Sequence, residues 1–322
     1  LGQGLGGSAI ALSSQDTGSG ATANRDEAVT QAMGLGFLIG IPLAICGVVF
    51  GSFAIEILGA TSEVVDLGGT YLAVVLLASP AHHVALIGVR ALQGTGDTRT
   101  PMLINIVANV INISGSIVLG LGLGPFPRLT ILGVGLATAI AHVFTAVSIL
   151  AVMVFDWVDL SLGRPENPTI TRQLVFIGIP RFAEGMSGTL AAFPLNSILL
   201  GFGTEVVAAF HIARRMRQQV TAPFYRSFST ASSVIVGQTI GGDTPGEAKF
   251  NGWAVIGLAA ILLSVSGGAM VLAAEPLARL FTSDPATLEY AVDFARVFGV
   301  GGVFFGMFFV VGGALRGAGE TR

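Results

Sequence analysis

Several stretches of more than 20 residues without a charged side chain constrain the fold of this chain most strongly. Residues 28–55 alone are 28 consecutive uncharged and mostly apolar positions. A helix needs about 20 such residues to cross the hydrocarbon core of a bilayer. Charged residues make up only 11% of the 322 positions, whereas an ordinary soluble domain has about a quarter. The sequence therefore predicts an all-α, multi-pass membrane protein.

A short polar segment occurs twice. Ala91–Arg99 reads ALQGTGDTR and Ala314–Arg322 reads ALRGAGETR, so six of nine positions are identical at an offset of 223 residues. A repeat this long in unbroken register predicts one half-molecule used twice. Because both copies keep them, we expect the following residues to stabilise cytoplasmic helix ends rather than to contact a substrate: Gln15, Gly94, Gly96, Asp97, Gln238, Gly317, Gly319 and Glu320.

The apolar runs predict nine membrane spans, the first of them partial. They are residues 1–15, 28–55, 67–89, 100–124, 129–155, 173–203, 206–240, 250–274 and 289–315. Asp16–Glu27 is expected as a polar loop. One further helix in front and two behind would complete two six-helix repeats, so the chain is expected to be a fragment lacking the first helix and the last two. The lobes would be residues 1–160 and 173–322, joined by a cytoplasmic linker over 161–172.

The basic residues of the connecting loops predict the orientation of the chain. Eight Lys and Arg residues fall in the loops that follow odd-numbered spans, and only two fall in the opposite loops. Cytoplasmic loops carry such an excess. We therefore expect the motif loops and both termini of the complete protein in the cytoplasm, with the protein in the plasma (inner) membrane. An even number of spans per repeat predicts two parallel repeats around a central cleft, the arrangement of alternating-access transporters.

Other function classes lack their motifs in this chain. No GxxxxGK[ST] loop is present, and the GxGxxG match at Gly2, Gly4 and Gly7 lies in an apolar helix, where glycines serve packing. Cys46 is the single cysteine, which excludes disulfides and cysteine metal sites. The spans contain neither HExxH nor a pair of aspartates for an intramembrane enzyme. We therefore expect no enzymatic activity, no cofactor and no metal centre.

The residues around the repeated motif resemble the multidrug and toxic compound extrusion (MATE) family. In the first lobe the resemblance is carried by Arg90–Met102 (RALQGTGDTRTPM), Asn109, Asn112 and Leu132–Gly135. In the second lobe it is carried by Gly178–Pro180, Glu184, Asn196, Ala208–Ala209 and Val236–Gly241 (VGQTIG). The resemblance implies twelve helices in two lobes and export of organic, often cationic, compounds by Na⁺ or H⁺ antiport.

The candidate substrate- or ion-binding residues are Glu184, Asn109, Asn112, Ser116, Asn196 and His82. Glu184 leads this set, because a buried carboxylate can take a proton, a metal cation or an organic cation. It lies one helical turn beyond Pro180, and the resemblance places a family carboxylate in this region. The alternative is an i,i+3 ion pair with Arg181 near a membrane interface.

Asn109 and Asn112 lie three residues apart, on one face of a helix, in the middle of a span. Their amides would either line a polar pocket in the first lobe or form interhelical hydrogen bonds. Many members of the resembled family have an aspartate four residues after the second asparagine, and this chain has Ser116 there. A hydroxyl cannot hold a proton charge, which puts the first-lobe coupling site of those members in doubt here.

The predicted spans also contain histidines and arginines. His82 would either face the cleft and titrate near neutral pH or pack as an ordinary core residue, while His142 and His211 are weaker candidates. Four arginines in the span 206–240 should reach an interface or face the cleft: Arg214, Arg215, Arg217 and Arg226. A cationic cleft would suit a flippase for lipid-linked oligosaccharides, the main alternative to multidrug efflux.

The expected partners are a small organic substrate of cationic or amphipathic character and the lipid bilayer. Nucleic acid is not expected as a partner, and the protein is expected to be a monomer. The coupling ion is left open between Na⁺ and H⁺.

Overall fold

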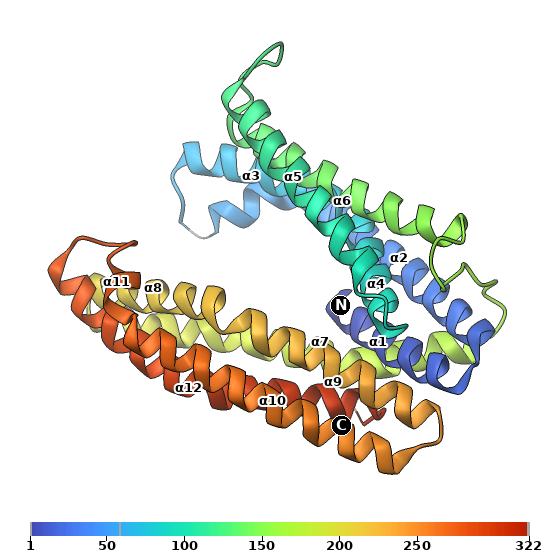
Figure 1. The fold of residues 1–322 in the computed structure, drawn as a ribbon. Helices are drawn as coiled ribbons and strands as arrows, with labels where there is room; N and C mark the ends of the chain where they lie inside the picture. Colours follow the sequence, from blue (N-terminus) through green and yellow to red (C-terminus); the bar gives the residue numbers. More distant parts are fainter. Residues whose placement is uncertain (1, 58, 321–322) are drawn as a thin grey trace. The chain divides into compact units, whose positions relative to one another are not determined.

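The computed structural model describes residues 2–57 and 59–320, except for the side chains of residues 3, 177, 180, 181, 184, 189, 192 and 193. All regular structure in these residues is helical (Figure 1). The helices are α1 (Gly2–Ser19), α2 (Thr22–Glu56), α3 (Ser62–Leu77), α4 (Ser79–Gly94), α5 (Arg99–Leu121), α6 (Thr130–Val154), α7 (Pro168–Leu200), α8 (Thr204–Val220), α9 (Ala222–Gly241), α10 (Pro245–Leu272), α11 (Ala274–Ala278) and α12 (Pro285–Gly317).

The described residues form two compact units, 1–181 and 182–322, and the boundary falls within α7. Five helices are long and apolar enough to cross a membrane, namely α2, α5, α6, α10 and α12. The pair α3 and α4 makes a sixth candidate, bent by 51°. The other three predicted spans are also helical, in α1, α7 and the pair α8 and α9, but they are not among these candidates in the part of the chain described.

Three predictions of where the helices break are wrong. Asp16–Glu27 is mostly helical, because only Gly20 and Ala21 separate α1 from α2, and Gly20 makes the turn with φ +73°. The predicted spans 67–89 and 206–240 are each two helices. Proline lacks an N–H donor and clashes with the preceding turn, and each break is followed by a proline: Pro80 after Ala78, and Pro223 after Thr221.

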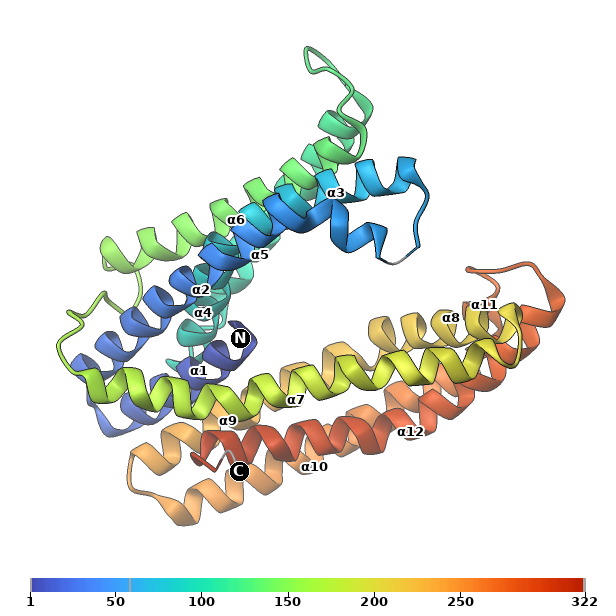
Figure 2. The ribbon, with the colours of Figure 1, turned by 180° about the vertical axis from the view of Figure 1, so that it is seen from behind.

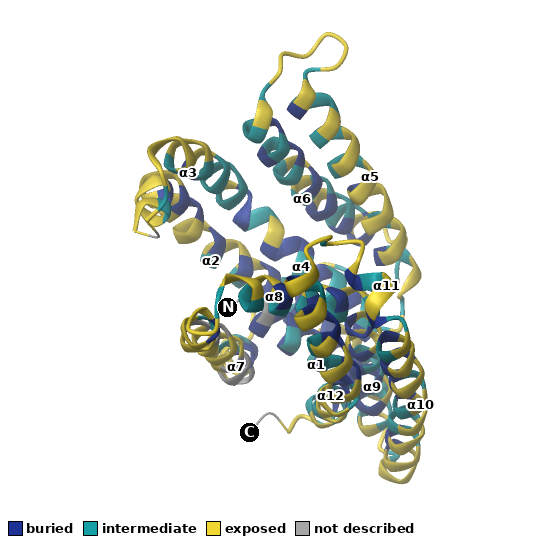
Figure 3. Cartoon of the chain, turned by 90° about the vertical axis from the view of Figure 1, so that its left-hand side faces the viewer, coloured by how far each residue is buried: buried dark blue, intermediate teal, exposed yellow. Residues whose placement is uncertain are grey.

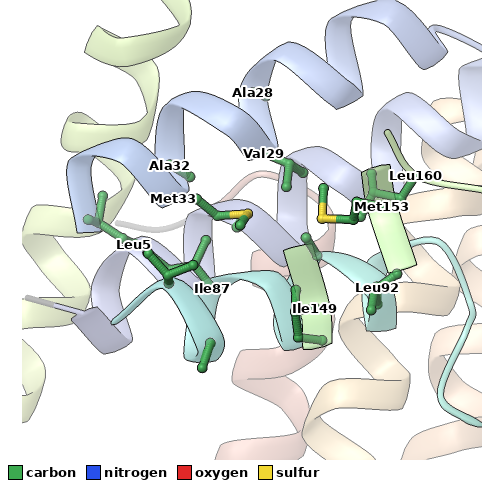
Figure 4. Close-up of a cluster of buried hydrophobic side chains, with 14 of the residues drawn as sticks. Leu5, Ala28, Val29, Ala32, Met33, Ile87, Leu92, Ile149, Met153 and Leu160 are labelled. Atoms are coloured by element: carbon green, nitrogen blue, oxygen red, sulfur yellow. The ribbon is translucent and has the colours of Figure 1, made fainter. Parts of the chain in front are cut away.

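The core of the first unit lies where α1, α2, α4 and α6 meet. Val29, Met33, Ile87, Ile149 and Met153 are almost fully buried there (Figure 4). The first half of α7 closes this core through Leu174, which has no exposed surface. By contrast, the apolar side chains along α5 are largely exposed (Figure 3). An exposed apolar face of this kind is what a lipid-facing helix presents.

In the second unit α9, α10 and α12 lie side by side (Figure 2), and α8 packs on α12. The guanidinium carbon of Arg217 lies 4.8 Å from the ring centre of Phe305 and 5.7 Å from that of Phe298, both on α12. Such cation–π contacts stabilise a cation away from water. Arg217 is therefore held by aromatic rings within this unit.

Asp284 caps α12 by accepting the Thr287 N–H at 2.8 Å, and the hydrogen bonds from Thr287 hold the pKa of Asp284 below its usual value.

The helix boundaries follow the sequence repeat. Adding the 223-residue offset to Thr22, Ser62 and Gly94 gives Pro245, Pro285 and Gly317, which are the corresponding ends of α10 and α12. A Cβ added to Gly94 would lie 3.0 Å from the Ile10 carbonyl oxygen on α1. A Cβ added to Gly317 would overlap the carbonyl oxygen of Ser233 on α9, the residue at the same offset from Ile10. The α1–α4 and α9–α12 pairs therefore pack through equivalent glycines.

At two other positions of these helix pairs, the glycine lies on the first helix of the pair in one copy and on the second helix in the other. On α1 and α4, Gly6 faces the Arg90 side chain, with its added Cβ 3.4 Å from Arg90 Cγ. At the equivalent positions Ser229 lies on α9 and the glycine, Gly313, lies on α12. The same exchange relates Gly2 and His83 to Tyr225 and Gly306. In each copy one small residue admits one larger partner, but the helix that carries the small residue differs.

The loop 155–167, which joins α6 to α7, is fastened to the start of α2. Glu27 Oε1 accepts the backbone N–H of Glu166 at 2.7 Å and that of Asn167, and it also accepts Gln31 Nε2 at 2.8 Å. Gln31 Nε2 donates to the Asn167 carbonyl at 3.0 Å, and Thr30 Oγ1 accepts the Gly163 N–H at 3.0 Å. We call this set of contacts the linker latch. It involves the region predicted as the linker (161–172), although α7 already begins at Pro168.

Candidate functional site

A polar pair joins α5 to α6 in the first unit. Asn112 Nδ2 donates to Thr138 Oγ1 at 3.0 Å, and Thr138 Oγ1 donates in turn to the Val134 carbonyl one turn earlier. The helices approach closely there, since a Cβ added to Gly115 would lie 3.0 Å from Ala137 Cβ. Asn112 and Thr138 are half-buried. Their oxygens form a polar point within an otherwise apolar helix pair.

Ser116 and Asn109 lie on either side of Asn112 along α5. Ser116 is half-buried one turn after Asn112. Asn109 is exposed, and its Nδ2 donates to the Asn105 carbonyl of its own helix at 2.8 Å. The two asparagines therefore differ, because Asn112 bonds across to α6 while Asn109 bonds within α5. A role of either amide in binding an ion or a substrate stays a prediction.

His82 lies on α4 and meets α6. Its Nδ1 is 3.4 Å from Nδ1 of His142, which follows Thr138 by one turn. The neighbouring His83 is buried and points elsewhere, with its Nδ1 donating to the Ser79 carbonyl at 2.7 Å. Thr138 and His142 are the site residues that sequence reasoning missed or ranked low. Their i,i+4 spacing on an apolar helix was the available signal.

Two candidates lie on α7. Asn196 is half-buried in the last two turns of that helix. Glu184 is also on α7, but its side chain lies outside the described residues, as does that of Arg181. The choice between a cation site and an ion pair at Glu184 therefore stays a prediction.

The repeated motif forms equivalent helix ends in both units. Gly96 and Gly319 have φ values of +94° and +87°, which favour glycine, and their N–H groups donate to the carbonyls of Gln93 and Arg316. Asp97 Oδ1 accepts the N–H groups of Arg99 and Thr100 at 3.0 Å, and so caps the start of α5. Glu320, at the equivalent position, is exposed.

The remaining motif residues lie next to these helix ends. Gln15 and Gln238 are half-buried near the ends of α1 and α9, and Gly94 and Gly317 make the close contacts described above. Among the described residues, no group of three or more His, Cys, Asp or Glu is placed to hold a metal ion.

Replacing Asn112 with valine should weaken the contact between α5 and α6. An interhelical hydrogen bond in a membrane protein contributes about 0.6 kcal/mol on average, so we expect a small loss of stability in detergent unfolding. Asn109→Val is the matched control, since its bond stays within one helix, and we expect it to be less destabilising. Equal effects of the two substitutions would contradict the assignment of the interhelical bond to Asn112.

The profile of the MatE family matches residues 1–118 and 182–322. A probable multidrug resistance protein, NorM, of Thermotoga maritima is 27% identical, with 80% of this chain and 56% of that protein covered. An FAD transporter of Shewanella oneidensis is 25% identical, with 85% of this chain and 61% of that protein covered. The chain thus spans less than two thirds of the length of these relatives.

A solved structure of a MOP superfamily transporter from Pyrococcus furiosus superposes on the whole chain with a TM-score of 0.92 at 21% identity, and 72% of that structure is covered. The likeness confirms the predicted fold class, an all-helical membrane protein with several spans. MatE is a family of transporters and not of enzymes. With the family profile matching most of its length, the chain belongs to the MatE family.

Proposed function

We propose that this chain forms the transport core of a secondary active exporter of organic compounds, driven by antiport of Na⁺ or H⁺. The observation that carries the proposal is the duplicated helix packing, in which Gly94 and Gly317 close equivalent helix pairs in two units. Duplicated bundles suit alternating access, because one copy can move against the other around a substrate site. Membership of the MatE family supports the same function.

In this proposal the residues that bind the ion or the substrate belong to separate parts of the chain. The first unit supplies Asn112, Ser116 and Thr138, whose oxygens suit a hard cation such as Na⁺. The second part of α7 supplies Glu184 and Asn196. The motif loops and the termini of the complete protein are proposed to face the cytoplasm, in accord with the distribution of Lys and Arg. The exporter is proposed to act as a monomer in the plasma (inner) membrane.

The substrate class is proposed as small organic compounds of cationic or amphipathic character. Relatives named for multidrug resistance support this choice, although another relative is named as an FAD transporter. The flippase alternative relied on a cationic cavity built from the arginines of 206–240. Arg217 contacts two aromatic rings of its own unit, which makes it less available to line such a cavity.

The direct test is transport by the purified protein in proteoliposomes. A fluorescent organic cation inside the vesicles should leave faster when either a Na⁺ or an H⁺ gradient is imposed, and a collapsed gradient should remove the effect. Lipid-linked oligosaccharide movement without ion dependence would support the flippase instead. Absence of efflux under both gradients would contradict the proposal.

Glu184→Gln tests the coupling role of that carboxylate. We expect normal insertion into the membrane and loss of most ion-driven efflux, because an amide cannot exchange a proton for a cation. Arg181→Gln is the companion variant: if Glu184 were held in an ion pair, both substitutions would lower thermal stability alike. Unchanged efflux in Glu184→Gln would remove Glu184 from the mechanism.

A further inference from the structure

Two histidines from different helices meet in the first unit. His82 on α4 and His142 on α6 bring their Nδ1 atoms to 3.4 Å, with ring centres 4.4 Å apart and ring planes inclined by 62°. One of these Nδ1 atoms must carry a hydrogen and the other a lone pair for the contact to be attractive. A hydrogen bond between the two Nδ1 atoms therefore requires opposite tautomers on the two rings.

This arrangement has room for one additional proton and not for two. The ring that donates through Nδ1–H has a free lone pair on Nε2, and a proton added there makes an imidazolium whose bond to the second ring is charge-assisted. A second proton would have to enter at the accepting Nδ1, where it would face the Nδ1–H of a cation. Like charges this close disfavour double protonation.

The surroundings of the pair contain few other titratable groups. His83 is engaged with the Ser79 carbonyl, and its ring centre is 5.8 Å from that of His82. On α4 and α6 and the helices packed against them, most titratable groups lie within two turns of a helix end: Asp16 of α1, Arg25, Asp26, Glu27 and Glu56 of α2, Glu63 and Asp66 of α3, Arg90 of α4 and Arg99 of α5. Two others, Cys46 and Tyr71, lie further inside α2 and α3. Tyr71 contacts Gly135, two turns before His142 on α6.

The pair also adjoins the polar point between α5 and α6. His142 follows Thr138 by four residues on α6, and Thr138 accepts a hydrogen bond from Asn112. Asn112, Thr138 and Ser116 are uncharged over the physiological pH range, so none of them can respond to a proton gradient. The two imidazoles can, since a neutral imidazole ring has a nitrogen lone pair that binds a proton.

We propose that His82 and His142 together form a proton-binding site that takes up a single shared proton and couples it to transport. This inference rests on the proposed antiport function and specifies the proton as a coupling ion. Uptake of the proton creates one positive charge beside Asn112 and Thr138, and its release restores a neutral pair. The first unit thereby has a titratable site although Ser116 stands where a carboxylate was expected from the resemblance.

The binding step can be tested without transport. The chain has four histidines, so ¹⁵N-histidine labelling of the purified protein in lipid nanodiscs gives a spectrum that single substitutions assign. We expect His82 and His142 to show opposite tautomers at high pH and to titrate together with an uptake of one proton. In His142→Asn the ¹⁵N chemical shifts of the His82 ring should change, because that ring loses its hydrogen-bonded partner. Independent titration of the two rings, or uptake of two protons, would overturn the proposal.

Transport then tests the coupling. His82→Asn and His142→Asn should each reduce H⁺-driven efflux to the rate measured without a gradient. His211→Asn should leave it unchanged, because His211 lies on α8 in the other unit. If the wild type exports under a Na⁺ gradient but not under an H⁺ gradient, the proposed coupling role of His82 and His142 is wrong. The proposed exporter function would then still stand. If the wild type exports nothing, the transport function fails, and the labelled spectra still decide whether the pair binds its proton.

Discussion

Gly313→Ala is expected to prevent close packing of α9 on α12 and to lower the thermal stability of the protein markedly. A Cβ added at Gly313 would lie 2.9 Å from the Ser229 C and Cα atoms and closer still to the Ser229 carbonyl oxygen. These are backbone atoms, which no rotamer change can move aside. Overpacking costs about 1–3 kcal/mol or more. Thermal unfolding in detergent and the yield of monodisperse protein would measure the effect.

Two further variants make this test specific. Gly301→Ala lies on the same helix, and an added Cβ meets nothing within 4 Å there, so its stability should equal or slightly exceed that of the wild type. Adding Ser229→Gly to Gly313→Ala should give no rescue, because the overlap is with the backbone of residue 229 and not with its side chain. A wild-type melting temperature for Gly313→Ala would show that α9 and α12 are not in such close contact.

Glu27→Ala should release the linker latch. Its carboxylate accepts two backbone N–H groups of the loop and the Gln31 amide, and a hydrogen bond to a charged group contributes about 1.5–3 kcal/mol. Loss of one such bond should speed amide hydrogen exchange at Glu166 and Asn167 about tenfold or more, since about 1.4 kcal/mol corresponds to a factor of ten. Exchange measured by mass spectrometry over residues 155–170 would report this.

The control for the latch is Glu166→Ala. Glu166 contributes its backbone N–H to the contact, and that donor survives the substitution. We expect amide exchange in the loop to stay at the wild-type rate in this variant. If Glu27→Ala and Glu166→Ala behave alike, the loop is held by something other than the Glu27 carboxylate.

Apolar run length predicted where the helices lie but not where they break. Each of the nine predicted spans is helical, because a long uncharged stretch in lipid must satisfy its backbone hydrogen bonds internally. The bend before Pro80 and the break before Pro223 depend on local chemistry that hydropathy averages away. Pro42 illustrates the difficulty, since it lies inside the unbroken helix α2. A proline alone therefore does not tell a break from a tolerated position.

The candidate site was predictable only in part. The sequence marked Asn109 and Asn112 as equal candidates. It did not show that Asn112 bonds to Thr138, 26 residues further along the chain, whereas Asn109 bonds within its own helix. His142 ranked low for the same reason, because its significance comes from His82 on another helix. Helix spacing identifies neighbours along one helix, whereas pairing across helices depends on packing that a single sequence does not contain.

The exchange of glycines between α1–α4 and α9–α12 has a consequence for how the two halves can diverge. A chimera carrying the α4 sequence in place of residues 302–317 would set His83 against Tyr225 and Arg90 against Ser229, where Gly306 and Gly313 now stand. Each helix surface fits the side chains of its own neighbour, so the two helix pairs are not interchangeable. Recombination between the halves is therefore expected to yield chains that do not fold.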